Sequence, residues 1–270
     1  MLLQTYIPQA PLSSFIDYFW LLEGYNPSHK RELALPNGST ELIIDLHNDT
    51  VQLFDRQNTR IILSSAIVCG PHSEHFIIDT ANESTMIGVH FKPGGATPFF
   101  DMPINELHNS IVPLDRLWGA RAKDLRDELL YSATTEHRFR ILEKYFLAQN
   151  PLSWSWNPAV KFALTEFRNS PYIHSISDTV EQIGMSPKRF IQLFKEEVGM
   201  TPKRFCRLMR FQKVILAIGQ GKRIEWMDVA IDSGYYDQAH FIKEFHAFSG
   251  LTPTNYRLIE GRHPNHVPLS

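Results

Sequence analysis

The fold of this protein is decided by two related stretches of sequence, SDTVEQIGMSPKRFIQLFKEEVG at residues 177–199 and WMDVAIDSGYYDQAHFIKEFHAFSG at residues 226–250. Each stretch predicts a short helix, a turn at a glycine and a second helix with apolar residues at helical spacing. The turn glycines, Gly184 and Gly234, lie 50 positions apart. Each unit closes with Gly-x-Thr-Pro, at 199–202 and 250–253. This internal repeat predicts two helix-turn-helix units.

The second helix of each unit has an apolar side and a polar side. Ser186 and Asp237 are the expected N-caps, and Pro187 suits the first turn of its helix. Phenylalanines recur on the inward side of both helices, whereas basic and amide side chains lie on the outward side. Such a helix, anchored from behind and polar in front, is what reading of the DNA major groove requires.

The segment between the units, TPKRFCRLMRFQKVILAIGQG at 201–221, predicts one long connecting helix. Such a spacer can place two recognition helices in successive major grooves, about 34 Å apart. The charge distribution agrees with a nucleic-acid partner for this half of the chain. Residues 1–150 carry a formal charge of −6 and residues 151–270 carry +4, so the net charge of −2 excludes a uniformly basic coat protein.

Residues 158–257 resemble the double helix-turn-helix domain of AraC/XylS-type bacterial transcription regulators. The motifs that carry the resemblance are Gly184-x-Ser186, Phe194-Lys195, the two Thr-Pro closures, Gly234-Tyr235 and Tyr256-Arg257. The resemblance implies a set of DNA-contacting residues on and beside the two recognition helices. These are Ser186, Lys188, Arg189, Ile191, Gln192, Lys195, Lys203, Arg204, Gln238, Ala239, His240 and Lys243. It also implies that Arg210, in the middle of the connecting helix, braces the two units.

Up to about residue 100 the sequence is rich in short strands. The expected strands at 41–46, 50–54, 60–70, 75–80 and 84–91 are separated by clusters of turn-forming residues. Helical spacing follows at 103–109, 113–117 and 119–147. We therefore predict an α+β chain, with a cupin-like N-terminal β-barrel or sandwich and trailing helices, followed by an all-α domain. The expected boundaries are 1–150, a linker at 151–158, the helix-turn-helix domain at 159–262 and a tail at 263–270.

A small barrel can hold one small ligand, so the N-terminal half is a candidate sensor. The phrases LPNGSTELIIDL and IGVHFKPGGATPFF resemble a β-rich domain of uncharacterised function found before this kind of DNA-binding module. Side chains that combine aromatic and polar character are the expected ligand contacts. They are Tyr18, Trp20, Glu41, His72 and His90.

Two alternatives stay open at the sequence level. A cupin-like metal-dependent enzyme would use His72, His75 and His90 with Glu41 as a carboxylate ligand. A chemical sensor would use the thiol of Cys69. No nucleophile elbow or phosphate-binding glycine loop supports catalysis, so we expect a non-enzyme without cofactor or metal.

The sequence therefore predicts a cytoplasmic transcription regulator that binds double-stranded DNA under the control of a small molecule. Two cysteines fit a reducing compartment, and no segment resembles a membrane span. A homodimer is compatible with the pattern, and RNA polymerase is the further expected partner of an activator.

Overall fold

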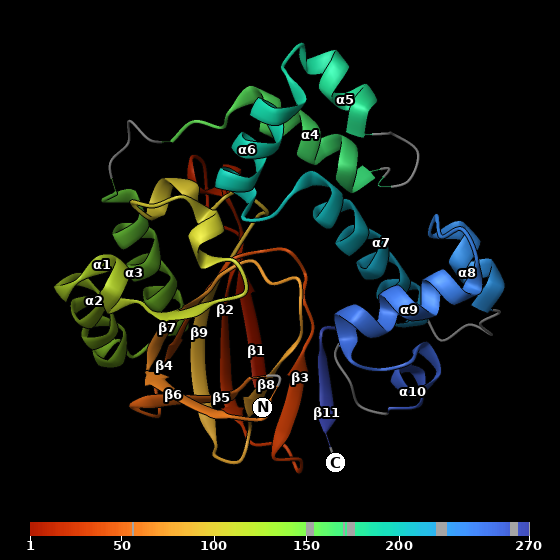
Figure 1. Ribbon diagram of the computed structural model, residues 1–270. Coiled ribbons are helices and arrows are strands. Elements are labelled where there is room, and N and C mark those ends of the chain that lie inside the picture. The colour runs from red at the N-terminus through yellow and green to blue at the C-terminus, as the bar shows by residue number, and fades with distance from the viewer. Residues whose placement is uncertain are drawn as a thin grey trace.

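A computed structural model describes residues 1–55, 57–149, 154–169, 171, 176–219, 226–259 and 264–269. The strands gather in the N-terminal part, with three helices on one side, and the remaining helices arch over the top and right of the strands (Figure 1). This order agrees with the predicted β-rich domain followed by a helical domain.

The strands form two antiparallel sheets. Sheet A has the order β1-β2-β9-β4-β7-β10. Its strands are β1 (Leu2–Tyr6), β2 (Ile16–Tyr25), β4 (Glu41–Asp45), β7 (Ala66–Cys69), β9 (Ser84–Phe91) and β10 (Ile111–Pro113). Sheet B has the order β11-β3-β8-β5-β6. Its strands are β3 (Arg31–Ala34), β5 (Thr50–Phe54), β6 (Arg60–Ser64), β8 (Phe76–Asp79) and β11 (His266–Leu269).

One face of sheet A packs against the trailing helices. Phe19 and Leu21 on β2 are fully buried in a core that also contains Leu125 and Phe146 from these helices. Because side chains alternate across a strand, Tyr18 and Trp20 point to the opposite face. The helices α1 (Asp115–Trp118), α2 (Ala120–Tyr131) and α3 (Thr135–Leu147) thus fix which side of sheet A is left for a ligand.

The sequence-based expectations for this domain are largely confirmed. The predicted run at 60–70 is instead two strands, β6 and β7, which belong to different sheets. The segment at 103–109 forms only a short 3-10 helix, η3 (Ile104–Leu107), and the region 113–117 is divided between β10 and α1. The predicted helix at 119–147 is broken between α2 and α3, where the side chain of Thr134 caps the second helix.

The helical domain has the predicted repeat. Its helices are α4 (Pro158–Asn169), α5 (Ile176–Ile183), α6 (Pro187–Val198), α7 (Pro202–Gly219), α8 (Trp226–Asp232), α9 (Gln238–Ser249) and α10 (Pro253–Leu258). Pro158 begins α4, and the side chain of Asn157 accepts a hydrogen bond from the amide of Ala159, as predicted. Residues 151–153 of the expected linker lie outside the described residues. Among the described helices, none combines the length and apolar character needed to cross a membrane.

The last strand joins the two parts of the molecule. β11 comes from the expected C-terminal tail but pairs with β3 of the N-terminal domain, with Val267 opposite Leu33. Val267 is fully buried in the same core as Phe205 and Phe211 of α7. In Figure 1 this strand lies beside β3 and beneath α9. The C-terminus therefore fastens the helical domain to sheet B.

Candidate functional site

Helix α6 is held by its buried face and its N-cap. Phe190, Phe194 and Val198 are at most 1% exposed, and the hydroxyl of Ser186 accepts a hydrogen bond from the amide of Arg189. Gly184, at the turn before the helix, has a φ of +70°. The predicted cap, turn and anchors of the first unit are all present.

The opposite face of α6 is open. Lys188, Arg189, Gln192 and Lys195 are exposed, and Ile191 is 41% exposed. The amide of Gln192 donates a hydrogen bond to Glu196 one turn later, at 2.9 Å. Guanidinium, ammonium and amide groups on one exposed helix face are the donors and acceptors that read base edges.

Helix α9 repeats this arrangement. The carboxylate of Asp237 accepts a hydrogen bond from the amide of His240 at 2.7 Å, and Phe241 and Phe245 are fully buried. Ala239 and Lys243 are exposed, whereas Gln238 and His240 are half-buried. The imidazole of His240 packs edge-on against Tyr235, so His240 has a structural contact besides its expected role toward DNA.

A buried carboxylate ties α9 to the connecting helix α7. Glu244 is 6% exposed and accepts a hydrogen bond from Nε of Arg207 at 2.5 Å. Nη2 of Arg210 lies 3.5 Å from the same carboxylate, and its guanidinium lies over the ring of Tyr235. Arg210 thus braces α7 against the second helix-turn-helix unit, and its expected role in joining both units stays a prediction. Sequence reasoning missed Glu244, although its place in the apolar stripe between Phe241 and Phe245 signals a buried, paired charge.

Arg204 and Lys195, which are both expected to contact DNA phosphates, lie near His108 of the N-terminal domain. Nη1 of Arg204 is 3.0 Å from Nε2 of His108. Burial lowers the pKa of His108, and the charges of Arg204 and Lys195 lower it further. Lys203, the neighbour of Arg204, is exposed.

The candidate ligand residues meet on the face of sheet A that is turned away from the helices. Tyr18 and Glu41 are both paired with His90 in the strand register. The Tyr18 and His90 rings stack with centroids 4.9 Å apart. One oxygen of Glu41 accepts from Nε1 of Trp20 and lies near Nδ1 of His90, with both distances at 3.2 Å. Four of the five predicted residues therefore form one cluster, which we call the Glu41 cluster: Tyr18, Trp20, Glu41 and His90.

The Glu41 cluster contains an ion pair. Burial alone lowers the pKa of His90, but the hydrogen bond and charge of Glu41 outweigh burial and raise it. Burial likewise works to raise the pKa of Glu41, but His90 outweighs it and lowers the pKa. The Glu41 side chain still has 28% of its surface exposed, so a small molecule can reach a charged acceptor between aromatic rings. Burial, with Glu41 and Asp17 nearby, raises the pKa of Tyr18 to about 12, which keeps its phenol protonated.

His72 is not part of this cluster, so its expected ligand contact stays a prediction without support from the neighbouring residues. Its ring packs against Phe76 at 4.7 Å, and burial lowers its pKa to about 4. Nδ1 of His75 lies 3.3 Å from the carbonyl oxygen of Phe248 in the other domain. Within the described ranges, no three His, Cys, Asp or Glu side chains are placed to hold one metal ion. The metal-site alternative needs His72, His75 and His90 together, and the structure gives these three side chains different neighbours.

The geometry also disfavours the thiol alternative. Cys69 is buried opposite Glu41 in the strand register, and burial together with the charge of Glu41 raises the pKa of its thiol. A buried thiol that resists ionisation is a poor nucleophile.

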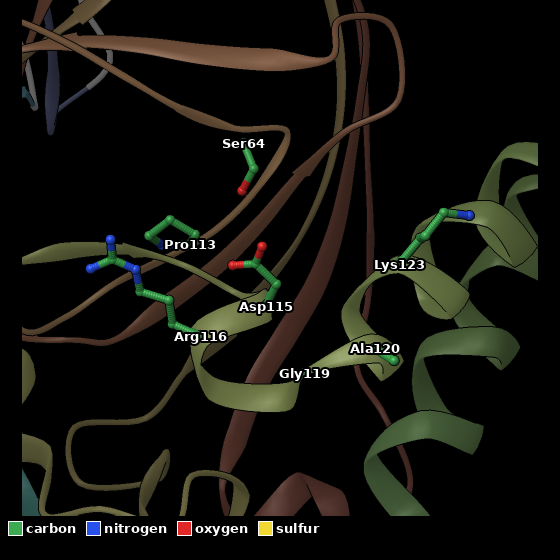
Figure 2. Close-up of a pocket in the computed structure, with 7 residues that line it drawn as sticks. All are labelled: Ser64, Pro113, Asp115, Arg116, Gly119, Ala120 and Lys123. Carbon is green, nitrogen blue, oxygen red and sulfur yellow. The ribbon is translucent and has the colours of Figure 1, made fainter.

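The molecule has hollows outside the Glu41 cluster. One, of about 600 Å³, lies between the end of β6 and the turn from α1 to α2. In Figure 2, Asp115 points toward Ser64 across this hollow, while Lys123 points away from it. None of the predicted site residues lines it, and its seven lining residues include no aromatic side chain, so we assign it no role.

Two sequence families match the chain. Residues 4–113 match a domain of unknown function, DUF6597, and residues 179–258 match a helix-turn-helix domain. No curated protein matches the sequence.

Several solved structures are similar. ToxT from Vibrio cholerae O395, bound to (E)-4-(8-methylnaphthalen-1-yl)but-3-enoic acid, has a TM-score of 0.50 at 10% identity, covering 88% of this chain and 98% of that chain. A second ToxT crystal form has a TM-score of 0.48 at 12% identity, over 94% and 97% of the two chains. The C-terminal domain of AraT, a response regulator from Geobacillus stearothermophilus, is 20% identical over 40% of this chain and 93% of its own, with a TM-score of 0.35.

Two helix-turn-helix units follow a two-sheet domain along the chain. This arrangement defines the class of the protein, which is a DNA-binding transcription regulator. Its C-terminal part is an AraC-type helix-turn-helix domain, and its N-terminal part is a DUF6597 domain.

Proposed function

We propose that the protein reads a specific DNA site with α6 and α9 and that a small molecule bound at the Glu41 cluster controls this binding. The observation that carries the proposal is the repeated, capped recognition helix with an open polar face. Arg189 and Gln238 are the expected base contacts, because guanidinium pairs with guanine and a side-chain amide with adenine. Lys188, Ile191, Gln192, Ala239, His240 and Lys243 complete the base-facing set, and Ser186, Lys195, Lys203 and Arg204 are the expected phosphate contacts.

The Glu41 cluster supports the second part of the proposal. Stacked rings beside an accessible carboxylate suit a small molecule with a planar part and a hydrogen-bond donor. The similarly folded ToxT is bound to an organic acid in one of its structures. The effector acts by favouring one placement of the helix-turn-helix domain over another, because a ligand shifts an equilibrium only through its different affinity for the two states.

In this function the protein catalyses no reaction, and it acts in the cytoplasm, where the DNA is. A homodimer and, for activation, RNA polymerase are its further partners. Sedimentation of the free and DNA-bound protein measures the first, and transcription with purified polymerase measures the second.

Footprinting of the upstream intergenic DNA across a salt series tests the proposal. Protection over two neighbouring major grooves, weakening with salt, is expected, because phosphate contacts release counterions. The Arg189→Ala, Gln238→Ala double variant should lose specific affinity by about 10-fold or more, since each good base contact is worth about 1 to 3 kcal/mol. The matched control is Arg140→Ala, Gln9→Ala, at exposed positions of the N-terminal domain. Equal protection by both double variants contradicts the assignment of the reading helices.

A further inference from the structure

A second hollow lies where the two domains meet. It has a volume of about 500 Å³, and its wall on the N-terminal side comes from Ser73, Glu74 and His75. The other wall comes from Arg204 and Arg207 on α7 and from the C-terminal end of α9, where Phe248 lies. A molecule in this hollow contacts both domains at once. Its volume is in the range of pockets that hold small molecules.

The hollow contains two guanidinium groups that retain hydrogen-bonding capacity. Arg204 donates to Nε2 of His108, and an imidazole carries no negative charge, so this bond does not neutralise the charge of Arg204. Nε of Arg207 donates to Glu244. Each guanidinium has five N–H donors, of which these bonds use one apiece. Guanidinium forks match the oxygens of carboxylates and phosphates, which makes arginine the usual residue for binding such anions.

We propose that this interdomain hollow binds a small organic oxyanion, a carboxylate or a phosphate, with Arg204 as its main contact. The hydroxyl of Ser73 on the facing wall suits a hydroxyl or amino group of the same molecule. The Glu41 cluster lies elsewhere, on sheet A, so the hollow is a separate site.

The regulatory part of this inference rests on the proposed function. Arg204 is also an expected DNA-phosphate contact, and in the docked arrangement it is turned toward His108. An anion bound between the domains therefore stabilises the docked state and competes with DNA for the same guanidinium. By linkage, DNA weakens anion binding by the same factor by which the anion weakens DNA binding.

Calorimetric titration of the full chain tests the site directly. The probes are sodium lactate, which carries a carboxylate and a hydroxyl, and inorganic phosphate, each against sodium chloride of equal ionic strength. Saturable binding of at least one probe is expected, and Arg204→Gln should weaken it at least 10-fold. His246→Gln, on the same wall, should weaken it less, whereas Arg140→Gln on α3 is the control that should leave it unchanged.

Each outcome is decisive. Tighter binding of lactate assigns a carboxylate ligand, and tighter binding of phosphate assigns a phosphate ligand. Absence of saturable binding by either probe overturns the site, as does binding that is equally strong in the Arg204→Gln variant. Because the titration contains no DNA, its failure is distinguishable from failure of the footprinting experiment.

Discussion

The ion pair between Glu41 and His90 makes the stability of the N-terminal domain depend on pH. The pKa of His90 is raised above its ordinary value of 6.5, so its contribution is complete below that pH and is lost as the pH rises through the folded-state pKa. The pKa of Glu41 is lowered from 4.5, so its contribution is complete above that pH and is lost as the pH falls through the folded-state pKa. The pair therefore stabilises most between these two ordinary values.

His90→Gln should reduce stability most near pH 5.5 and progressively less toward pH 9. Urea unfolding at pH 5.5, 7 and 9 measures the difference from the unmodified protein. Glu41→Gln should show the same decline toward high pH, since either substitution removes the ion pair. A deficit that stays constant with pH would show that packing, and not the ion pair, is responsible.

Glu197, at the end of α6, has the opposite effect on stability. Burial raises its pKa to about 7, although a hydrogen bond from the backbone amide of Asn157 opposes the shift. Between pH 4.5 and about 7 this carboxyl is largely ionised in the unfolded chain but still protonated in the folded protein. The free energy of unfolding therefore falls as the pH rises through this range.

Glu197→Gln should raise the melting temperature by a few degrees at pH 8 and leave it nearly unchanged at pH 4, because the amide stays neutral. Thermal unfolding at both pH values measures this gain. Glu181→Gln, at an exposed position on α5, is the control and should give no comparable gain at pH 8. A gain at pH 4 as large as that at pH 8 contradicts the pH argument.

At the scale of elements, β11 is the unusual feature, because it belongs to the sheet of another domain. The amide of Leu35 donates to the carbonyl of Asn265, which extends the pairing beyond the strand. The side chain of Gln212 on α7 donates to Pro36 and to Asn265, so the connecting helix holds both strands. Three segments far apart in the sequence thus share one junction.

Val267→Ala should lower the free energy of unfolding by about 1 to 3 kcal/mol, the usual cost of deleting methyl groups from a packed core. Urea unfolding measures the loss, and hydrogen exchange at the amides of β3 should become faster. Leu258→Ala, at a residue 72% exposed on α10, is the control and should change stability by less than about 0.5 kcal/mol. Unchanged exchange in β3 would show that β11 does not hold this edge.

A comparison of the predicted helices and strands with the observed ones shows which features the sequence predicts. Caps, turns and the apolar stripes of α6 and α9 depend on residues within a few positions of one another, and all were predicted. The strands β1, β2 and β3 were not predicted, because their sequences lack clear alternation and strong flanking turns. The division of 60–70 into β6 and β7 was missed for a similar reason: a continuous apolar run does not indicate where a chain changes sheets.

At the scale of the whole molecule, Gly199 is a point of close approach between the helical domain and the N-terminal domain. It ends α6 with a φ of +85°, and a Cβ there would lie 2.2 Å from Pro71. The hydroxyl of Thr97 donates to the carbonyl of Glu197 beside it. A side chain at this position therefore meets both backbone strain and a clash across the domain junction.

Gly199→Ala should cost more stability than Gly184→Ala and should separate the domains. Gly184 has a similar φ of +70°, but its Cβ would meet nothing within 4 Å, so its substitution costs only the backbone strain of about 1 to 2 kcal/mol. Urea unfolding measures the two costs, and small-angle scattering measures the expansion expected of Gly199→Ala alone. If both variants lose the same free energy of unfolding and keep the same radius of gyration, the domain junction at Gly199 accommodates the added methyl group without separation of the domains.

The sequence by itself determined the helix-turn-helix repeat, its caps, the exposed polar faces of α6 and α9 and the β-rich character of the N-terminal half. These features follow from interactions between near neighbours along the chain, which a sequence displays directly. Only the tertiary structure decided that His90 meets Glu41, that Arg204 meets His108 and that β11 completes sheet B. Such contacts join residues far apart in the sequence, so they depend on sheet order and on how the two domains dock, which local periodicity does not encode.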